Sequence, residues 1–294
     1  RVLFRSKAVD AVSRFFKIYA TGTVGFVARN FYSALYMNGV AGVSPLIMRE
    51  SAEAMIRAGR NPVRWLDEIA DPTLKAEYEQ AWKAALASSR GFFNEIAEPI
   101  FAGSRAEKAI LSNPFTRLIA NGNEHVERMV RFQMALDTIR KQGNTPAAFT
   151  EAVQRIARYH FDYSDLSRVD AALLRFVPFW IWMSRNIPNQ IANQWMRPSA
   201  YATYEKIQDS LPLDDKTVLP AWMSEYGPMG IGKFFGQDLI LRPDMPQYRL
   251  DRAVDQMTRL DRIVGSMYPM YKVPVEWIDR KSTRLNSSHV SESR

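Results

Sequence analysis

The sequence predicts a mainly α-helical protein: an irregular array of many helices, some of them kinked, with a small loop-rich flap that holds a β-hairpin near residues 229–242. Three observations lead to this fold class. Capping residues followed by proline recur along the first half of the chain. Apolar side chains repeat at helical spacing up to about residue 210. Proline and glycine then become frequent after Leu211, which favours loops and short strands.

The helix starts are marked by five pairs of a capping residue and a proline. A short side-chain oxygen at the N-cap accepts a hydrogen bond from a backbone N–H that has no partner within the helix. Proline at the first helical position gives up only a donor that would have been left without a partner. The pairs are Ser44-Pro45, Asn61-Pro62, Asp71-Pro72, Asn113-Pro114 and Thr145-Pro146.

The apolar residues recur every three or four positions, as on one face of a helix. We expect Gly91 and Gly143 to end two of these helices. The periodic faces are Leu74, Tyr78, Ala81, Trp82 and Ala85; Val126, Met129, Val130, Gln133 and Leu136; Phe149, Val153, Ile156 and His160; and Leu166, Val169, Leu173, Val177, Trp180 and Ile187. Further helices are predicted at 8–20, 24–38, 45–59, 199–209 and 252–266.

Two parts of the chain differ in their residue composition and pattern. Residues 7–211 read as a helical body, and residues 212–280 read as a loop-rich flap followed by a C-terminal helix that packs on this body. Within the flap, Ile231 to Leu241 predict a hairpin that turns around Gly236, Gln237 and Asp238.

The two ends of the chain resemble translated sequencing-adapter read-through. We expect residues 1–6 and 281–294 to be such artefacts and leave them out of the fold prediction. Each end carries two net positive charges, so the formal charge of +8 falls to +4 for the remainder. A mildly basic chain gives only a weak indication of an acidic partner. With 47% hydrophobic residues, the chain is too apolar for a disordered protein.

Few residues carry recognisable chemistry. The chain has no Cys, and His125 and His160 are the only His residues outside 281–294, so thiolate and His-rich metal sites are excluded. Gly227 to Lys233 lacks the spacing of a phosphate loop, and His160 with Asp162 has no nucleophilic serine elbow. No apolar run approaches the roughly 20 residues of a spanning helix. We therefore predict no catalytic, metal or cofactor site.

Two segments are distinctive. In the first, Arg29, Asn30 and Asn38 lie among large apolar residues. Buried polar groups need partners, so we expect these side chains to hydrogen-bond to neighbouring helices and fix their packing.

The second segment runs from Phe161, Asp162 and Tyr163 to Pro188. Pro178 should kink its helix, and Pro188 should kink it again or end it. Its aromatic side chains either fill the core or form a contact surface for a partner or membrane, and both alternatives stay open. The residues that define it are Phe161, Asp162, Tyr163, Pro178, Phe179, Trp180, Trp182, Arg185, Asn186 and Pro188.

These segments resemble a helical domain of the large polyvalent proteins of phages and prophages. The similar elements are Gly-Phe-x-x-Arg-Asn from Gly25 to Asn30, Phe161 to Leu166, Pro178 to Pro188 and Tyr268 to Glu276. They span most of residues 20–280 in the same order. The chain departs from the family in having Trp180 and Trp182 where smaller or hydroxylated residues are commoner.

The resemblance implies a non-enzymatic structural or delivery module of a virion-internal protein that is ejected with the DNA. Its expected partners are other domains of the same long chain, other virion proteins and an anionic membrane surface. Its expected locations are the virion and then the host cytoplasm or envelope. The contact surface would be residues 171–197, with Arg175, Arg185 and Arg197.

Two alternatives belong to other classes. The first is a nucleic-acid-binding helical module, for which the basic candidates are Arg128, Arg131, Arg140, Lys141, Arg155 and Arg158. The second is an enzyme with no recognisable motif, whose site would be assembled from dispersed carboxylates and Arg.

Overall fold

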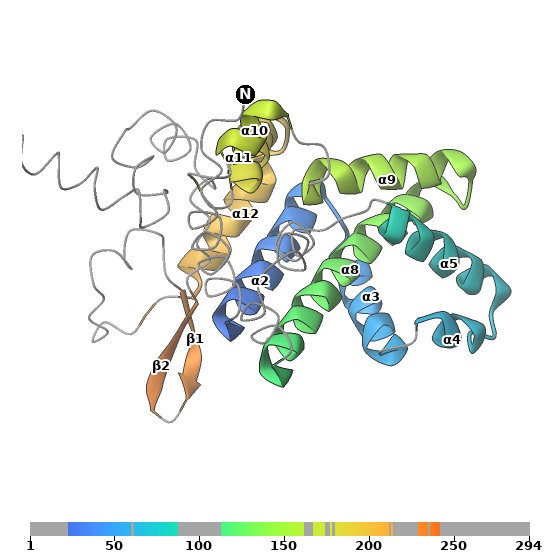
Figure 1. Cartoon of the computed structure of the whole chain (residues 1–294), viewed down its shortest axis with the longest axis horizontal. Coiled ribbons are helices and arrows are strands. Elements are labelled where there is room, and N and C mark those ends of the chain that lie inside the picture. The colour runs from blue at the N-terminus through green and yellow to red at the C-terminus, as the bar shows by residue number, and fades with distance from the viewer. Residues whose placement is uncertain are drawn as a thin grey trace, which may run out of the picture.

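The computed structural model describes residues 23–59, 62–87, 113–161, 167–173, 177, 180–211, 213, 229–234 and 236–241. Within this part of the chain it contains nine helices and one hairpin, which confirms the mainly α-helical fold (Figure 1). The helices are α2 (Val24–Ala41), α3 (Pro45–Ala58), α4 (Pro62–Asp67), α5 (Pro72–Ala87), α8 (Pro114–Gln142), α9 (Pro146–His160), α10 (Arg168–Leu173), α11 (Trp180–Met196) and α12 (Pro198–Asp209).

All five pairs of capping residue and proline begin a helix at the proline, as predicted. At two of them the cap is direct: Thr145 Oγ1 accepts from Ala148 N at 3.2 Å, and Asp71 Oδ1 accepts from Thr73 N at 2.9 Å. Gly143, with φ of 84°, follows the last residue of α8, as expected for a helix end. Gly91 lies outside the described residues.

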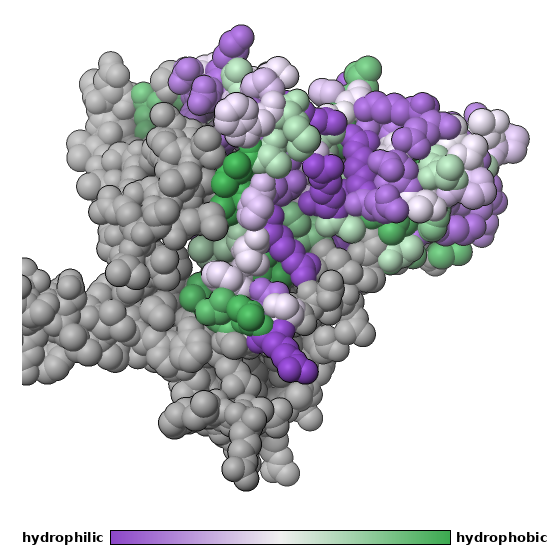
Figure 2. All heavy atoms as spheres, turned by 90° about the horizontal axis from the view of Figure 1, so that it is seen from above, coloured by the Kyte–Doolittle hydropathy of each residue, from purple (hydrophilic) through white to green (hydrophobic). Residues whose placement is uncertain are grey.

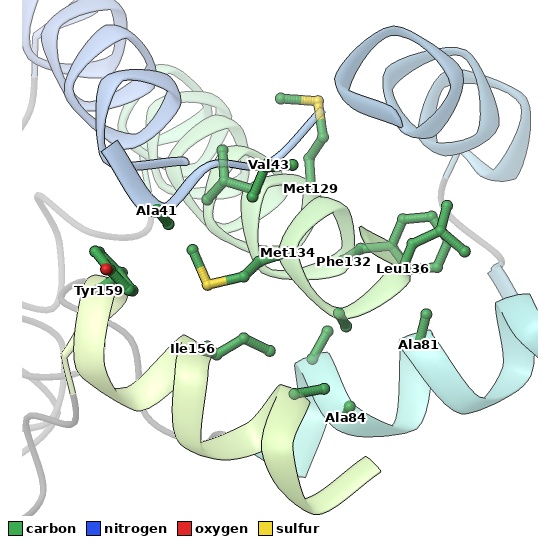
Figure 3. Close-up of a cluster of buried hydrophobic side chains, with 14 of the residues drawn as sticks. Ala41, Val43, Ala81, Ala84, Met129, Phe132, Met134, Leu136, Ile156 and Tyr159 are labelled. Atoms are coloured by element: carbon green, nitrogen blue, oxygen red, sulfur yellow. The ribbon is translucent and has the colours of Figure 1, made fainter. Parts of the chain in front are cut away.

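Helix α8 is the centre of the fold. Helices α2, α3, α5 and α9 all pack against it. Figure 3 shows apolar side chains of α8 beside those of α2, α5 and α9. Phe132, Met134 and Leu136 are fully buried on α8. Small residues opposite them, such as Ala81 and Ala84 on α5, let the helices approach closely. The core is therefore centred on the second half of α8, from Met129 to Ile139.

The C-terminal helices differ in one respect from the prediction. The apolar pattern from Leu166 to Ile187 predicts one kinked helix, but the structure divides it into α10 and α11. Pro188 lies inside α11, which continues to Met196, so this proline does not end the helix. Pro188 is exposed, where the loss of one backbone donor costs least.

Helix α12 packs on α2 through tyrosines. The ring of Tyr36 on α2 meets those of Tyr201 and Tyr204 edge-on, with centroids 6.2 and 5.1 Å apart. Tyr201 also donates its hydroxyl to Gln190 Oε1 of α11 at 2.6 Å. These contacts join α2, α11 and α12 into a second cluster beside the α8 core.

The predicted hairpin is present. Strands β1 (Met229–Phe234) and β2 (Gln237–Leu241) pair antiparallel, with a register irregularity between Gly230 and Gly232. Its turn lies between Phe234 and Gln237 and includes Gly236, with φ of 77°. Gln237 and Asp238, which were expected in the turn, belong to β2. Gly230 N donates to Leu211 O at 3.0 Å, which ties the hairpin to the chain after α12. The helices predicted at 8–20 and 252–266 lie outside the described residues.

Candidate functional site

The first motif lies on α2, and its polar residues have different roles. Asn30 Nδ2 donates to Asn123 Oδ1 of α8 at 3.4 Å. Asn38 is fully buried and donates to Val130 O at 3.0 Å and to Gln133 Oε1 at 2.8 Å. The expected contacts between helices are confirmed for both. The expected burial is wrong for Arg29, which is exposed on α2.

A directed chain of hydrogen bonds runs through Asn38 and joins four helices. Gln133 Nε2 donates to Met48 O of α3 at 3.2 Å, so Gln133 Oε1 is free to accept from Asn38. Because Asn38 Nδ2 is the donor to two oxygens, its Oδ1 must accept from His160 Nε2, at 2.8 Å on α9. The contact therefore requires the tautomer with the proton on Nε2.

Burial and, to a smaller extent, the nearby charge of Arg131 together lower the pKa of His160 to about 3. The imidazole is neutral at physiological pH and serves as a donor in the core. His160, which the sequence places on an apolar helix face, thus has a structural hydrogen bond there.

A second buried cluster surrounds Asp137 of α8, whose side chain is 1% exposed. It accepts from Arg155 at 2.8 Å, from Lys141 at 2.8 Å and from Ser44 N at 3.1 Å. Burial alone would raise the pKa of this carboxyl, but these hydrogen bonds hold it below its ordinary value. The carboxylate thus joins α8, α9 and the start of α3.

Three cations bind the last carbonyls of α2. Arg197 donates to Val40 O at 3.3 Å, Arg155 to Ala41 O at 2.7 Å and Lys141 to Gly42 O at 3.0 Å. A helix C-terminus carries partial negative charge and carbonyls without partners, so cations are favoured there. The three come from the residue before α12, from α9 and from α8, and so fasten three elements to the end of α2.

Gly42 makes this arrangement possible. Its φ of 75° lies in the left-handed region, and a Cβ there would overlap Arg197 Nη1. The guanidinium therefore occupies the space that any other side chain would need.

A third cluster lies at the other side of α8. Arg140 Nη2 donates to Glu50 Oε1 at 2.6 Å, and its Nε donates to Glu77 at 3.0 Å. The Arg140 guanidinium lowers the pKa of Glu50, and Tyr78 also donates to this carboxylate at 2.6 Å. Burial, followed by the contact with Glu50, raises the pKa of Tyr78. The arrangement links α3, α5 and α8.

The second motif is only partly described. Asp162, Tyr163, Pro178 and Phe179 lie outside the described residues. Phe161 is buried and ends α9 with φ of 53°, an unusual conformation for a side chain of this size.

The two tryptophans at the start of α11 pack against the core. Trp180 and Trp182 are half-buried and pack against the main apolar cluster. Trp180 Nε1 also donates to Asp170 Oδ1 at 2.8 Å. Hydrogen bonds from Ser167 and Trp180 lower the pKa of Asp170, and the charge of Arg185 adds to this effect. Of the two open alternatives, core packing therefore holds for both tryptophans.

The inner face of α11 combines buried isoleucines with buried amide side chains. Asn186 is buried and accepts from Gln190, at 3.1 Å, and Asn193 accepts from the Tyr159 hydroxyl of α9, at 3.0 Å. Among the described residues of 171–197, the exposed large apolar side chains are those of Trp195 and Met196, which are 77% and 55% exposed. A contact surface within 171–197 would thus lie at the end of α11.

Most of the basic residues of the nucleic-acid alternative have partners within the fold. Arg140, Lys141 and Arg155 form the ion pairs given above, and Arg128 pairs with Glu124 on the same helix. Arg131 is buried. Arg158 alone of this group is both exposed and without an ion pair to any described residue; it lies over the Tyr159 ring at 5.8 Å.

The remaining sequence patterns have structural roles where they are described. Met229 to Lys233, part of the glycine-rich stretch, belongs to the first strand of the hairpin. Among the described residues, no group of three or more His, Asp and Glu is arranged to hold a metal ion. No described helix is both long and apolar enough to span a membrane.

The sequence reasoning missed the cluster around Asp137 and the exposed end of α11. A signal existed for the first, because Asp137 and Lys141 are four residues apart on one helix. No local signal indicates that Trp195 is exposed while Trp180 is not.

Comparisons with protein-family models, with curated proteins and with solved structures found no match to this chain.

Proposed function

We propose that this chain is a non-enzymatic structural and delivery module of a large polyvalent phage protein, carried inside the virion and ejected with the DNA. Its partners are other domains of the same long polypeptide, other virion proteins and an anionic membrane surface. The resemblance of the four ordered sequence elements motivates the proposal. The role of the described motif residues supports its structural part.

The observation that carries the proposal is that the motif residues act at contacts between helices. Asn38 uses its amide to join α2, α8 and α9, and Trp180 joins α11 to Asp170 of α10. Residues that hold helices in register are what a scaffold needs. The carboxyls of Glu50, Asp137 and Asp170 have lowered pKa values because cations or donors bind them, which suits structural contacts better than proton transfer.

The proposal is tested in particles from a culture that carries the gene. Gradient-purified virions are first treated with nuclease and external protease, which should leave the protein intact because it lies inside the capsid. The particles are then disrupted and digested with trypsin, which should release the peptide Phe132–Arg140 of α8. Detection in the cell lysate but not in the particles would refute the proposal. A tail or capsid protein of the same particles serves as the positive control.

A further inference from the structure

The end of α11 combines exposed apolar side chains with cations. Trp195 and Met196 project at the last turn of the helix, and Arg197 follows directly. Figure 2 looks down on the side where α9, α10 and α11 lie: hydrophilic side chains gather over α9, and paler or apolar ones lie over α10 and α11. A strongly hydrophilic area over α9 thus borders a less hydrophilic one over α10 and α11.

The cations near this end are held in place by the fold. Arg197 N donates to Asn193 O at 2.7 Å, and Asn193 also accepts from Tyr159, over whose ring Arg158 lies. Lys141 and Arg197 both contact the Gly42 turn. The same tyrosine and the same turn therefore place Arg158, Lys141 and Arg197 around the end of α11.

This surface carries a clear excess of positive charge. Arg155 and Lys141 contact the carboxylate of Asp137, whereas Arg197 contacts a backbone carbonyl and Arg158 the Tyr159 ring. These five described side chains together carry a net charge of +3. Asp137 is buried, whereas Lys141, Arg158 and Arg197 are exposed. Neither Arg158 nor Arg197 forms an ion pair with a described residue. Three of the four cations are therefore exposed to solvent, and Arg155 is not.

We infer that Trp195, Met196, Arg158, Lys141 and Arg197 form a surface that docks on an anionic lipid bilayer. Tryptophan favours the headgroup region, where its ring is partly buried and its N–H stays hydrated. Met196 adds apolar area, and each cation near an anionic leaflet strengthens binding by about fivefold. The inference names one partner of the proposed delivery module and so rests on that proposal.

A nucleic acid fits this surface less well. Binding of single strands relies on a row of aromatic side chains that stack on successive bases. Here one exposed tryptophan is next to a methionine, and three exposed cations would neutralise few phosphates. The combination of apolar and basic side chains matches a bilayer interface more closely.

The experiment is vesicle flotation of the whole 294-residue chain. Vesicles of phosphatidylcholine alone are compared with vesicles that also contain phosphatidylserine. The chain should float with the anionic vesicles, and high salt should reduce binding. Trp195→Ser with Met196→Ser should lower the floated fraction at least about tenfold, and Arg158→Gln by about fivefold. Leu46→Ser with Ile56→Ser, equally exposed apolar residues on α3, is the matched control and should float like the wild type.

Several results would overturn the inference. They are absence of flotation with anionic vesicles, equal loss in the α3 control, and Trp195-dependent binding of a single-stranded oligonucleotide in place of vesicles. Melting curves of each variant show that it is folded, since all four substituted apolar side chains are exposed. A chain that is packaged in virions but does not float would disprove the membrane surface and leave the proposed function standing. A chain that floats but is absent from virions would disprove the proposed function and leave the membrane surface standing.

Discussion

His160 is the residue through which mild acid should act on the fold. The neutral imidazole bonds to Asn38 through Nε2. Protonation of this imidazole would place a second positive charge near Arg131 inside the fold. Because its folded-state pKa is depressed to about 3, the unfolded chain binds a proton between that value and about 6.5 that the folded chain does not. The stability from this group is present above the unfolded-state pKa and is lost as the pH falls.

We therefore expect the free energy of unfolding to fall by about 2 kcal/mol between pH 7 and pH 5 through His160 alone. Urea unfolding at both pH values measures it. His160→Gln keeps a side-chain donor and should remove this share of the pH dependence. An identical pH dependence in the variant would show that His160 is not held neutral in the core.

Asp137 and Glu124 provide a matched comparison of buried and exposed ion pairs on one helix. Asp137→Asn leaves Arg155, whose side chain is 14% exposed, without its carboxylate and should cost about 3 kcal/mol. Glu124→Gln breaks the exposed pair with Arg128 and should cost less than about 1 kcal/mol. Denaturant unfolding of both variants measures the difference. Equal losses would mean that the Asp137 cluster does not hold the helices together.

At the scale of the element, α2 depends on how its C-terminus is closed. Gly42→Ala places a Cβ in the left-handed region and displaces Arg197 from Val40 O, so it should destabilise the fold by about 1–2 kcal/mol. Gly39 lies inside the same helix, and a Cβ added there would have open space around it. Gly39→Ala should therefore stabilise the fold by about 0.5–1 kcal/mol.

Thermal melts of the two variants should move in opposite directions from the wild type. If both alanines lowered the melting temperature alike, the cations at the end of α2 would not explain why Gly42 is needed.

Helix starts were predictable because their causes are local. A capping side chain and a proline at the next position act within one turn, and all five such pairs begin a helix. The division between α10 and α11 was missed because an apolar repeat continues across both. The apolar repeat alone does not indicate where the backbone stops being helical.

At the scale of the whole molecule, the contacts that fix the helix array join distant parts of the chain. Asn38 binds Val130, 92 residues away, and His160, 122 residues away. Which polar groups meet depends on the register between helices, which one-dimensional periodicity does not contain. For the same reason the pattern could identify Trp180 and Trp195 as apolar positions but could not assign one to the core and the other to solvent.

The partners of the basic residues also depend on how the helices pack. The basic residues that suggest nucleic-acid binding in the sequence are mostly engaged in ion pairs between or along helices. The net charge of the chain is therefore a poor guide to its partners, and the exposed cations near the end of α11 are the informative ones.

The central proposal is that the chain travels in the virion and enters the host. The most direct measurement uses particles that carry an epitope-tagged copy. After adsorption, shearing separates the emptied particles from the cells, and the tag is quantified in both fractions. We predict that the tag leaves the particles and is found with the cells, alongside the DNA. Retention of the tag in the sheared particles, or its absence from particles before adsorption, would contradict the proposal.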